Sequence, residues 1–209
     1  MSGEAGQFAG KAERWSETAY ASPDAYLAHR AELVATLGVP LAPRDEVLDL
    51  ACGDGGLGLH LLARGLAYRG VDAEPAMIHA ASKLLGDAAP VERGELDTYE
   101  PPAPVAATTV FRAIYYARDR QAFFARARSF TTTKLVFDLN PRQYRVADVV
   151  AGLEAAGFAR VVLRPFLVPQ TRRLPGAAVR LAIAAERTPL ARLALRRRFT
   201  YLVAALVEG

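Results

Sequence analysis

The stretch Val47-Leu-Asp-Leu-Ala-Cys-Gly-Asp-Gly-Gly-Leu-Gly58 decides the fold that we expect of this chain. It opens with a short apolar run of the kind found in strands buried on both faces. Its glycines allow a tight turn and let a ligand approach the main chain. Helical spacing resumes from Leu57 to Arg64. The stretch therefore predicts a strand, a glycine-rich turn and a helix, and ligands bind at such turns in open α/β sheets.

The same alternation continues along the chain. We expect strands at 46–51, 68–71, 91–93, 105–111, 134–139 and 158–163, and helices at 57–64, 74–85, 119–130 and 146–156. A further helix over 177–198 precedes a last strand at 199–207. Short connections between alternating strands and helices predict the α/β class, with a Rossmann-like, doubly wound and mostly parallel sheet of about seven strands. The last strand follows a long crossover, so we expect it to be antiparallel.

Composition narrows the class of protein. The chain has 209 residues, of which 52% are apolar and 23% charged, as in ordinary globular proteins. The lone Cys52 excludes a disulfide framework and argues against a cysteine-based zinc site. No stretch approaches the ~18 apolar residues of a membrane span, and the first residues lack the apolar run of a signal peptide. We therefore expect a cytoplasmic protein without a transmembrane segment.

Charge is divided between the two halves of the chain. Residues 1–100 hold 8 Lys and Arg against 16 Asp and Glu, which gives −8, whereas residues 101–209 hold 18 against 6, which gives +12. One interpretation is that one half meets a cationic ligand and the other an anionic partner. The other is that the halves intermix on folding and the surface averages out.

Two acidic residues stand at the ends of the first two strands. Asp49 precedes the glycine turn, whose spacing departs from the G-x-G-x-x-G of pyrophosphate binders. A carboxylate there repels a pyrophosphate and favours a ligand with cationic groups. Asp72 follows 23 residues later, where a carboxylate commonly binds ribose hydroxyls. The alternative role for Asp72 is to cap the helix that begins near Glu74-Pro75.

The patterns D-L-A-C-G-D-G (49–55) and G-V-D-A-E-P-A-M-I (70–78) resemble those of class I S-adenosylmethionine-dependent methyltransferases, and the resemblance extends over about 40–165. It implies S-adenosylmethionine as cofactor, S-adenosylhomocysteine as product and no metal. It implies one methyltransferase domain over 1–209, with a helical lid (1–40), a cofactor-binding core (41–165) and a C-terminal helical segment with the final strand (166–209).

The resemblance also assigns cofactor-binding residues. The glycine-rich loop, which approaches the methionine part, carries Asp49, Ala51, Gly53 and Gly55, with Ala51 in place of the commonest glycine. Asp72 is assigned to the ribose, and Ala73, Met77 and Leu96 to the surroundings of the adenine. Glu95 is assigned to the adenine amine, with Asp97 as its competitor. Phe111 and Arg112 stand where the fourth strand passes the methionine part of the cofactor.

The N-terminal helices of such relatives close over the cofactor and the acceptor. Trp15, Tyr20, Tyr26 and Arg30 are the candidates for contact, of which Tyr20 and Arg30 are assigned to cofactor binding. An arginine at this place can pair with the cofactor carboxylate. The alternative for each residue is the packing of an amphipathic helix.

Methyl transfer depends mainly on alignment and desolvation, and a base is needed only if the acceptor must lose a proton. Many small-molecule members carry a His-His pair after the fourth strand, and here Tyr115 and Tyr116 occupy those positions. Either tyrosine can orient or deprotonate a hydroxyl, or wall the pocket. His29 is a further candidate base, because its helix is expected to cover the site.

We therefore expect a methyltransferase acting on a small molecule, with O-methylation favoured and an anionic acceptor possible; Asp138 and Asn140 are candidates to hold a polar acceptor. Two alternatives stay open. One is an RNA methyltransferase that uses the basic C-terminal half, including Arg196-Arg197-Arg198. The other is a non-catalytic S-adenosylmethionine-binding protein with a regulatory or scaffolding role.

Overall fold

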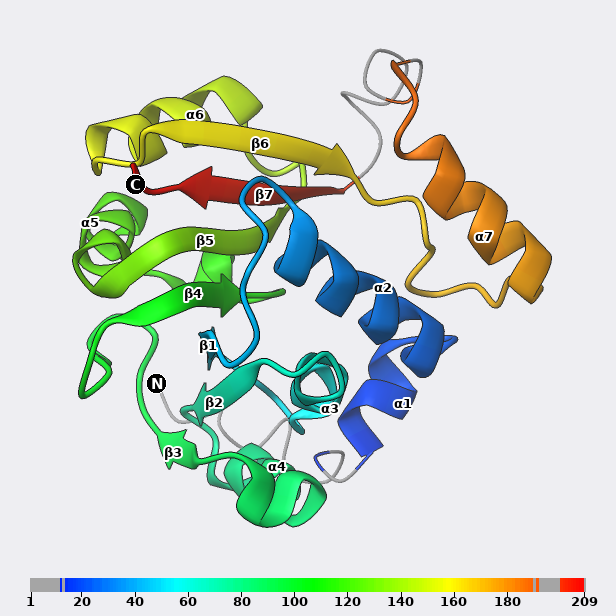
Figure 1. The fold of residues 1–209 in the computed structure, drawn as a ribbon, viewed down its shortest axis with the longest axis horizontal. Helices are drawn as coiled ribbons and strands as arrows, with labels where there is room; N and C mark the ends of the chain where they lie inside the picture. The colour runs from blue at the N-terminus through cyan, green and yellow to red at the C-terminus, as the bar shows by residue number, and fades with distance from the viewer. Residues whose placement is uncertain (1–11, 13, 190, 192–199, 209) are drawn as a thin grey trace.

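One seven-stranded sheet forms the centre of the computed structural model, which describes residues 12, 14–189, 191 and 200–208 (Figure 1). Its strands are β1 (Glu46–Leu50), β2 (Ala67–Asp72), β3 (Val91–Arg93), β4 (Val105–Val110), β5 (Thr131–Leu139), β6 (Arg160–Pro165) and β7 (Tyr201–Leu206). The α-helices are α1 (Trp15–Ala19), α2 (Pro23–Thr36), α3 (Gly56–Leu62), α4 (Pro75–Leu85), α5 (Arg120–Phe130), α6 (Val146–Ala155) and α7 (Gly176–Ala185), and the short 3₁₀ helices are η2 (Gly86–Ala88) and η3 (Ile114–Tyr116).

The strands run in the order β3-β2-β1-β4-β5-β7-β6. β1 pairs in parallel with β2 and β4, while β7 lies between β5 and β6 and is antiparallel to both. The expected doubly wound, mostly parallel sheet with an antiparallel last strand is thus confirmed. The order reverses between β1 and β4, and the crevice outside the carboxyl ends of these strands is where such sheets bind ligands.

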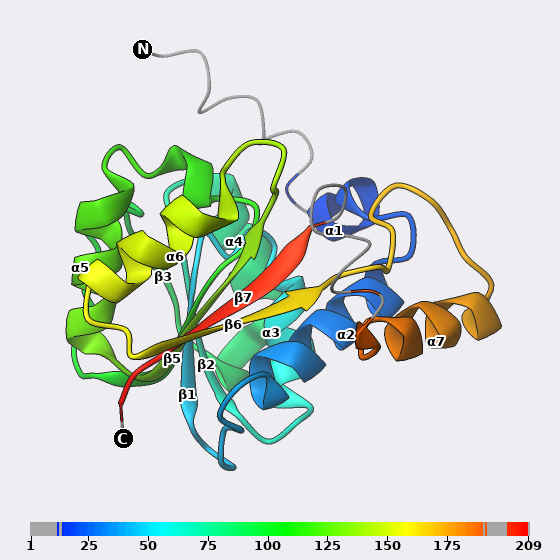
Figure 2. The same cartoon turned by 90° about the horizontal axis from the view of Figure 1, so that it is seen from above.

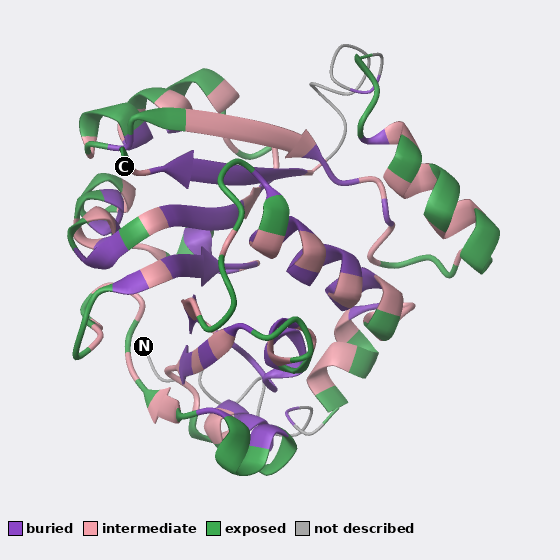
Figure 3. Cartoon of the chain, in the orientation of Figure 1, coloured by how far each residue is buried: buried purple, intermediate pink, exposed green. Residues whose placement is uncertain are grey.

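Helices cover both faces of the sheet (Figure 2). α2 and α3 pack on one face and α5 and α6 on the other. β7 is buried along its whole length because successive side chains enter opposite layers, and Figure 3 shows it as one continuous buried strand. Leu202, Ala204 and Leu206 join the α2–α3 layer, and Tyr201, Val203 and Ala205 join the α5–α6 layer.

Several element boundaries differ from expectation by two or more residues. β5 begins at Thr131, directly after α5, rather than at 134. β6 begins at Arg160 rather than 158, because Phe158 N–H bonds the Leu153 carbonyl and so closes the end of α6. α7 ends at Ala185 and a non-helical stretch follows at 186–188, whereas most of the remainder of the helix expected over 177–198 lies outside the described residues. The Arg196–Arg198 run lies outside the described residues.

None of the helices in the described part of the chain combines the length and the apolar character that a membrane crossing requires.

A buried lysine fastens the N-terminal helices to the sheet. Lys134 on β5 is fully buried, and its Nζ donates to the carbonyls of Ala35, Leu37 and Val39 at 3.4, 3.0 and 2.6 Å. These carbonyls lie at the C-terminal end of α2 and beyond it, where helices leave acceptors unpaired. Burial lowers the pKa of Lys134 to about 8, so the amine is still mostly charged at pH 7.

We expect Lys134→Met to lower the free energy of unfolding by about 2–4 kcal/mol at pH 7, because the carbonyls lose a charged donor while the apolar stem is kept. Urea denaturation followed by circular dichroism measures this. The exposed Lys83, changed to Met, is the control and should stay within about 0.5 kcal/mol of wild type. Equal midpoints for the two variants would show that Lys134 does not fasten α2.

Candidate cofactor and acceptor site

A cavity of about 970 Å³ opens at the carboxyl ends of β1, β2, β3 and β4. Its walls come from α1 and α2, from the glycine loop after β1, and from the segments that follow β2, β3 and β4. It therefore lies beside the point where the strand order reverses. Its volume is that of a pocket for a cofactor-sized ligand.

The glycine loop turns through three left-handed residues. Ala51, Gly53 and Gly55 have φ values of 61°, 60° and 78°. A Cβ on Gly53 would lie 3.0 Å from the Trp15 ring. Ala51 adopts a conformation that costs a residue with a Cβ about 1 kcal/mol, which gives a physical reason why glycine is commonest there. The loop thus presents backbone rather than side chains to the cavity.

Asp49 places a buried carboxylate in the cavity wall. It is 3% exposed, and it accepts hydrogen bonds from the hydroxyls of Tyr68 (2.9 Å) and Thr109 (2.7 Å). Burial raises the pKa of Asp49 to about 6 in spite of these hydrogen bonds. The group is therefore charged at pH 7 at a cost in solvation, and a cationic group of a ligand would offset that cost.

Asp72 joins the glycine loop to the segment before α4. One carboxylate oxygen accepts from Gly53 N–H at 2.9 Å and the other from Glu74 N–H at 3.0 Å. Burial raises the pKa of this carboxyl as well. Asp72 thus holds the backbone of Glu74, which is the N-cap residue of α4, and it also lines the cavity. Its contact with a ribose stays a prediction.

Asp54 fastens the lid to the loop, and sequence reasoning missed it. Its carboxylate accepts from Ser16 N–H at 2.7 Å, from the Ser16 hydroxyl at 2.7 Å and from Gly56 N–H at 3.1 Å. Because Ser16 belongs to α1, the first helix is held directly over the glycine loop. The only sequence signal was an acid between two glycines.

Arg30 sits in an aromatic enclosure at the back of the cavity. It is 1% exposed, its guanidinium carbon lies 4.1 Å from the Phe111 ring centroid, and it donates to the hydroxyls of Tyr20 and Tyr26. Its Nη2 also lies 3.2 Å from Asp138 Oδ2. The charge of Arg30 is therefore already compensated within the protein, and a bond to the cofactor carboxylate stays a prediction.

Residues 47–134 match a family model described as a methyltransferase domain. The matched segment runs from β1 into β5 and takes up 88 of the 209 residues; over it the chain is similar to a methyltransferase domain. None of the curated proteins compared with it matches the chain in sequence.

Solved structures of methyltransferases share the fold of this chain at low sequence identity. One is from the complex between the Haloferax volcanii Trm112 methyltransferase activator and a methyltransferase, with 16% identity, a TM-score of 0.66, and 97% of this chain and 98% of that chain covered. Another is an S-adenosylmethionine dependent methyltransferase from Mesorhizobium loti, with 18% identity and a TM-score of 0.64; the match covers 86% of this chain and 97% of that chain. A third is magnesium protoporphyrin IX methyltransferase from Synechocystis PCC 6803 with bound S-adenosylmethionine, with 17% identity and a TM-score of 0.56; the match covers 97% of this chain and 85% of that chain.

The cavity at the carboxyl ends of β1–β4 brings together most of the residues that the sequence singled out. Those lining it are Trp15, Tyr20, Arg30, Asp49, Ala51, Gly53, Asp72, Ala73, Met77, Glu95, Leu96, Asp97, Phe111, Arg112, Tyr115 and Tyr116. Gly55 does not line it; a Cβ there would meet Ala81 and Leu85 of α4 at 3.1 Å. Asn140 does not line it either.

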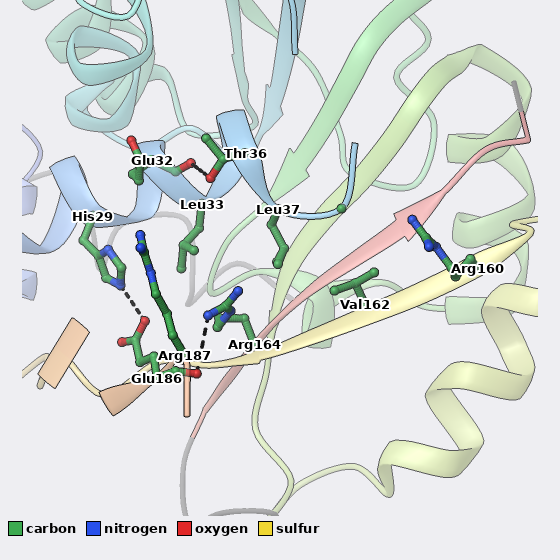
Figure 4. Close-up of a pocket in the computed structure, with 11 residues that line it drawn as sticks. His29, Glu32, Leu33, Thr36, Leu37, Arg160, Val162, Arg164, Glu186 and Arg187 are labelled. Carbon is green, nitrogen blue, oxygen red and sulfur yellow. Dashed lines mark hydrogen bonds and ion pairs between the residues drawn. The ribbon is translucent and has the colours of Figure 1, made fainter. Parts of the chain in front are cut away.

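His29 lies on a different cavity. Its Nε2 is 2.7 Å from Oε2 of the buried Glu186, and both residues line a pocket of about 400 Å³ between α2, β6 and the end of α7 (Figure 4). Glu186 also accepts from Leu167 N–H at 2.7 Å, so the pair joins α2 to the chain after β6. His29 is absent from the lining of the large cavity, and its role as a base stays a prediction without geometric support.

Tyr115 and Tyr116 form an open wall of the large cavity. They are 45% and 55% exposed, and their ring centroids lie 4.5 Å apart. Burial and the neighbouring Tyr116 raise the pKa of Tyr115 to about 12. Tyr115 therefore keeps its proton at neutral pH, which suits a wall or a hydrogen-bond donor better than a base.

The cavity fits S-adenosylmethionine by its chemistry. Asp49 supplies a buried negative charge for a cationic group, and the left-handed loop admits close approach to the backbone. Glu95 has no hydrogen bond to its carboxylate among the described residues, whereas Asp97 accepts from Arg118 N–H. Glu95 is therefore the freer of the two acids considered for the adenine amine. No group of three or more His, Cys, Asp or Glu that could hold a metal ion occurs in the described part of the chain.

Proposed function

We propose that this protein transfers the methyl group of S-adenosylmethionine to a small molecule, with an oxygen atom as the favoured acceptor. The observation that carries the proposal is the single cavity in which acids from the ends of β1 and β2 face an open aromatic wall after β4. A small acceptor is consistent with a cavity of about 970 Å³. The name of one similar structure, magnesium protoporphyrin IX methyltransferase, also specifies a small molecule.

In this proposal Asp49 and the backbone of the glycine loop hold the methionine part of the cofactor, and Asp72 holds the ribose. Glu95 binds the adenine amine, with Met77 and Leu96 against the ring. When bound, S-adenosylmethionine supplies an electrophilic methyl group on a positively charged sulfur. The residues of the chain then orient and desolvate the acceptor, because alignment provides much of the acceleration of a methyl transfer.

The proposed role of the lid and the tyrosine wall is to exclude water and fix the acceptor. Asp54 keeps α1 over the loop through Ser16. Tyr115 and Tyr116 provide ring faces for packing. An acceptor that ionises readily suits this site, since a group with a pKa of about 12 does not act as a base at neutral pH.

The test is an acceptor screen with a radiolabelled methyl donor, run on small phenols and carboxylic acids and, in parallel, on total RNA. We expect label in the small-molecule fraction. Label in RNA, with binding that falls steeply as salt rises, would instead favour the nucleic-acid alternative. Binding of S-adenosylhomocysteine without transfer to any acceptor would favour a non-catalytic role.

Asp72→Asn is expected to weaken S-adenosylhomocysteine binding at least about tenfold, because an amide has one acceptor oxygen where the carboxylate offers two. Isothermal calorimetry on wild type and variant measures this. The exposed Asp87, changed to Asn, loses the same charge outside the cavity and should bind as wild type does. An Asp72→Asn affinity within twofold of wild type would remove the ribose assignment.

A further inference from the structure

Arg112 stands at the carboxyl end of β4 in an unusual backbone conformation. Its φ is 56°, in the left-handed region that disfavours residues with a Cβ. Its N–H donates to Asp138 Oδ1 at 2.7 Å, while Arg30 takes the other oxygen of Asp138. The surrounding structure thus holds the backbone of Arg112 in a conformation that is intrinsically unfavourable for this residue. Such enforced strain is commonest where a side chain is aimed at a ligand.

Arg112 lines the cavity, and one nitrogen of its guanidinium lacks a hydrogen-bond partner among the described residues. Its central carbon lies 5.4 Å from the Trp15 ring and 5.7 Å from the Tyr20 ring, so aromatic faces from the lid fix its plane. Its Nη1 is buried and has no hydrogen-bond partner among the described residues. A buried charged donor without a partner is costly, and an anionic oxygen supplied by a ligand would remove that cost.

The position of Arg112 separates it from the acidic side of the cavity. Asp49 lies near the end of β1, Asp72 ends β2 and Glu95 follows β3, on the side that we assign to the cofactor. Arg112 follows β4, on the other side of β1, and the chain continues directly into Tyr115 and Tyr116. A cation next to two partly exposed rings suits a ligand that carries both an apolar body and an acid group.

We infer that the Arg112 side chain binds the carboxylate of the methyl acceptor, rather than the methionine part of the cofactor to which the resemblance assigned this residue, and that the acceptor is an organic acid with an aromatic or otherwise apolar body. The inference rests on the proposed function, because it takes the other side of the cavity to be filled by the cofactor. The Arg112 guanidinium can donate two parallel hydrogen bonds to a carboxylate. The rings of Tyr115 and Tyr116 would cover the apolar body.

The chain contains a single tryptophan, Trp15, which packs next to the Arg112 guanidinium and so serves as the reporter. The probe is benzoate, with the uncharged benzamide as its matched control. Each is added to protein saturated with S-adenosylhomocysteine, and Trp15 fluorescence is excited at the red edge of its absorption. We expect a saturable change with benzoate and little or none with benzamide.

In Arg112→Gln the half-saturating concentration of benzoate should rise at least about tenfold, while affinity for S-adenosylhomocysteine stays within about threefold. Arg120→Gln, which loses the same charge outside the cavity, should behave as wild type. If Arg112→Gln folds poorly, Arg112→Lys replaces it: the charge is kept, the planar fork is lost, and benzoate binding should still weaken.

Equal titrations with benzoate and benzamide would overturn the inference, as would unchanged benzoate binding in Arg112→Gln. A loss of S-adenosylhomocysteine affinity greater than tenfold in Arg112→Gln would also overturn it, because Arg112 would then hold the cofactor. If wild type binds no S-adenosylhomocysteine at all, the proposed function itself fails. The two failures are therefore distinguishable.

Discussion

Asp49→Asn is expected to weaken S-adenosylhomocysteine binding about 30- to 100-fold at pH 7 without lowering the free energy of unfolding. The buried carboxylate is the negative charge that we assign to the cofactor ammonium. In the free protein that charge is unfavourable, because burial disfavours the ionised form and raises the pKa of Asp49 to about 6. A raised carboxyl pKa means that ionisation costs the folded state about 3 kcal/mol at pH 7, and the amide relieves that cost.

The same group gives a pH signature. Its folded-state pKa of about 6 lies above its unfolded value of about 4. Its stabilising contribution is therefore full below pH 4 and is lost as pH rises through 6. Relative to Asp49→Asn, wild type should lose stability between pH 4 and pH 7. Its affinity for S-adenosylhomocysteine should fall as pH is lowered below 6.

Calorimetry across this pH range, with urea denaturation in parallel, measures both effects. Asp49→Asn serves as the control, because its affinity should be nearly flat where that of wild type falls. Parallel loss of affinity in the two proteins would show that another group titrates. A variant that is markedly less stable than wild type would contradict the view that the charge is held for the ligand.

Asp138→Asn is expected to cost about 3 kcal/mol of unfolding free energy, because it leaves the Arg30 cation buried without its carboxylate. Arg30→Met should cost less, since an apolar side chain of similar length fits among aromatic rings and the Asp138 carboxylate keeps its bond from Arg112 N–H. The double variant should recover part of the loss that Asp138→Asn causes.

A double-mutant cycle by urea denaturation tests this pair. A coupling energy above about 1 kcal/mol is expected for two groups that depend on each other in a buried site. Losses that add to within about 0.5 kcal/mol would show that Arg30 is held by its aromatic enclosure alone. The cycle also reports on the β4 end, because Asp138 holds the strained backbone of Arg112.

The fold could be predicted from the sequence because local pattern and global topology agree. The helix expected over 119–130 is α5, and Asp119 is its N-cap, with a carboxylate that accepts from Gln121 N–H and Ala122 N–H at 2.9 and 3.0 Å. The boundaries that differed depend on long-range pairing. β5 extends back to Thr131 because that residue pairs with Val105 of β4, which no local pattern shows.

The site was predictable where its residues follow strands in a recognisable spacing, as Asp49 and Asp72 do. The contacts that support these residues could not be predicted from the sequence. Thr109 reaches Asp49 across 60 positions and Ser16 reaches Asp54 across 38, so tertiary structure alone brings them together. Only the structure shows where these charges lie in space: the acids Asp49, Asp72 and Glu95 line the cavity at the carboxyl ends of β1, β2 and β3, and Arg112 lines it after β4.

The central claim is that the cavity at the carboxyl ends of β1–β4 binds S-adenosylmethionine. Isothermal calorimetry of the wild-type protein with S-adenosylhomocysteine tests it most directly. The account predicts one-to-one binding with a dissociation constant in the micromolar range, weakened by both Asp49→Asn and Asp72→Asn. Folded wild-type protein that binds none of the ligand at about 1 mM would contradict it.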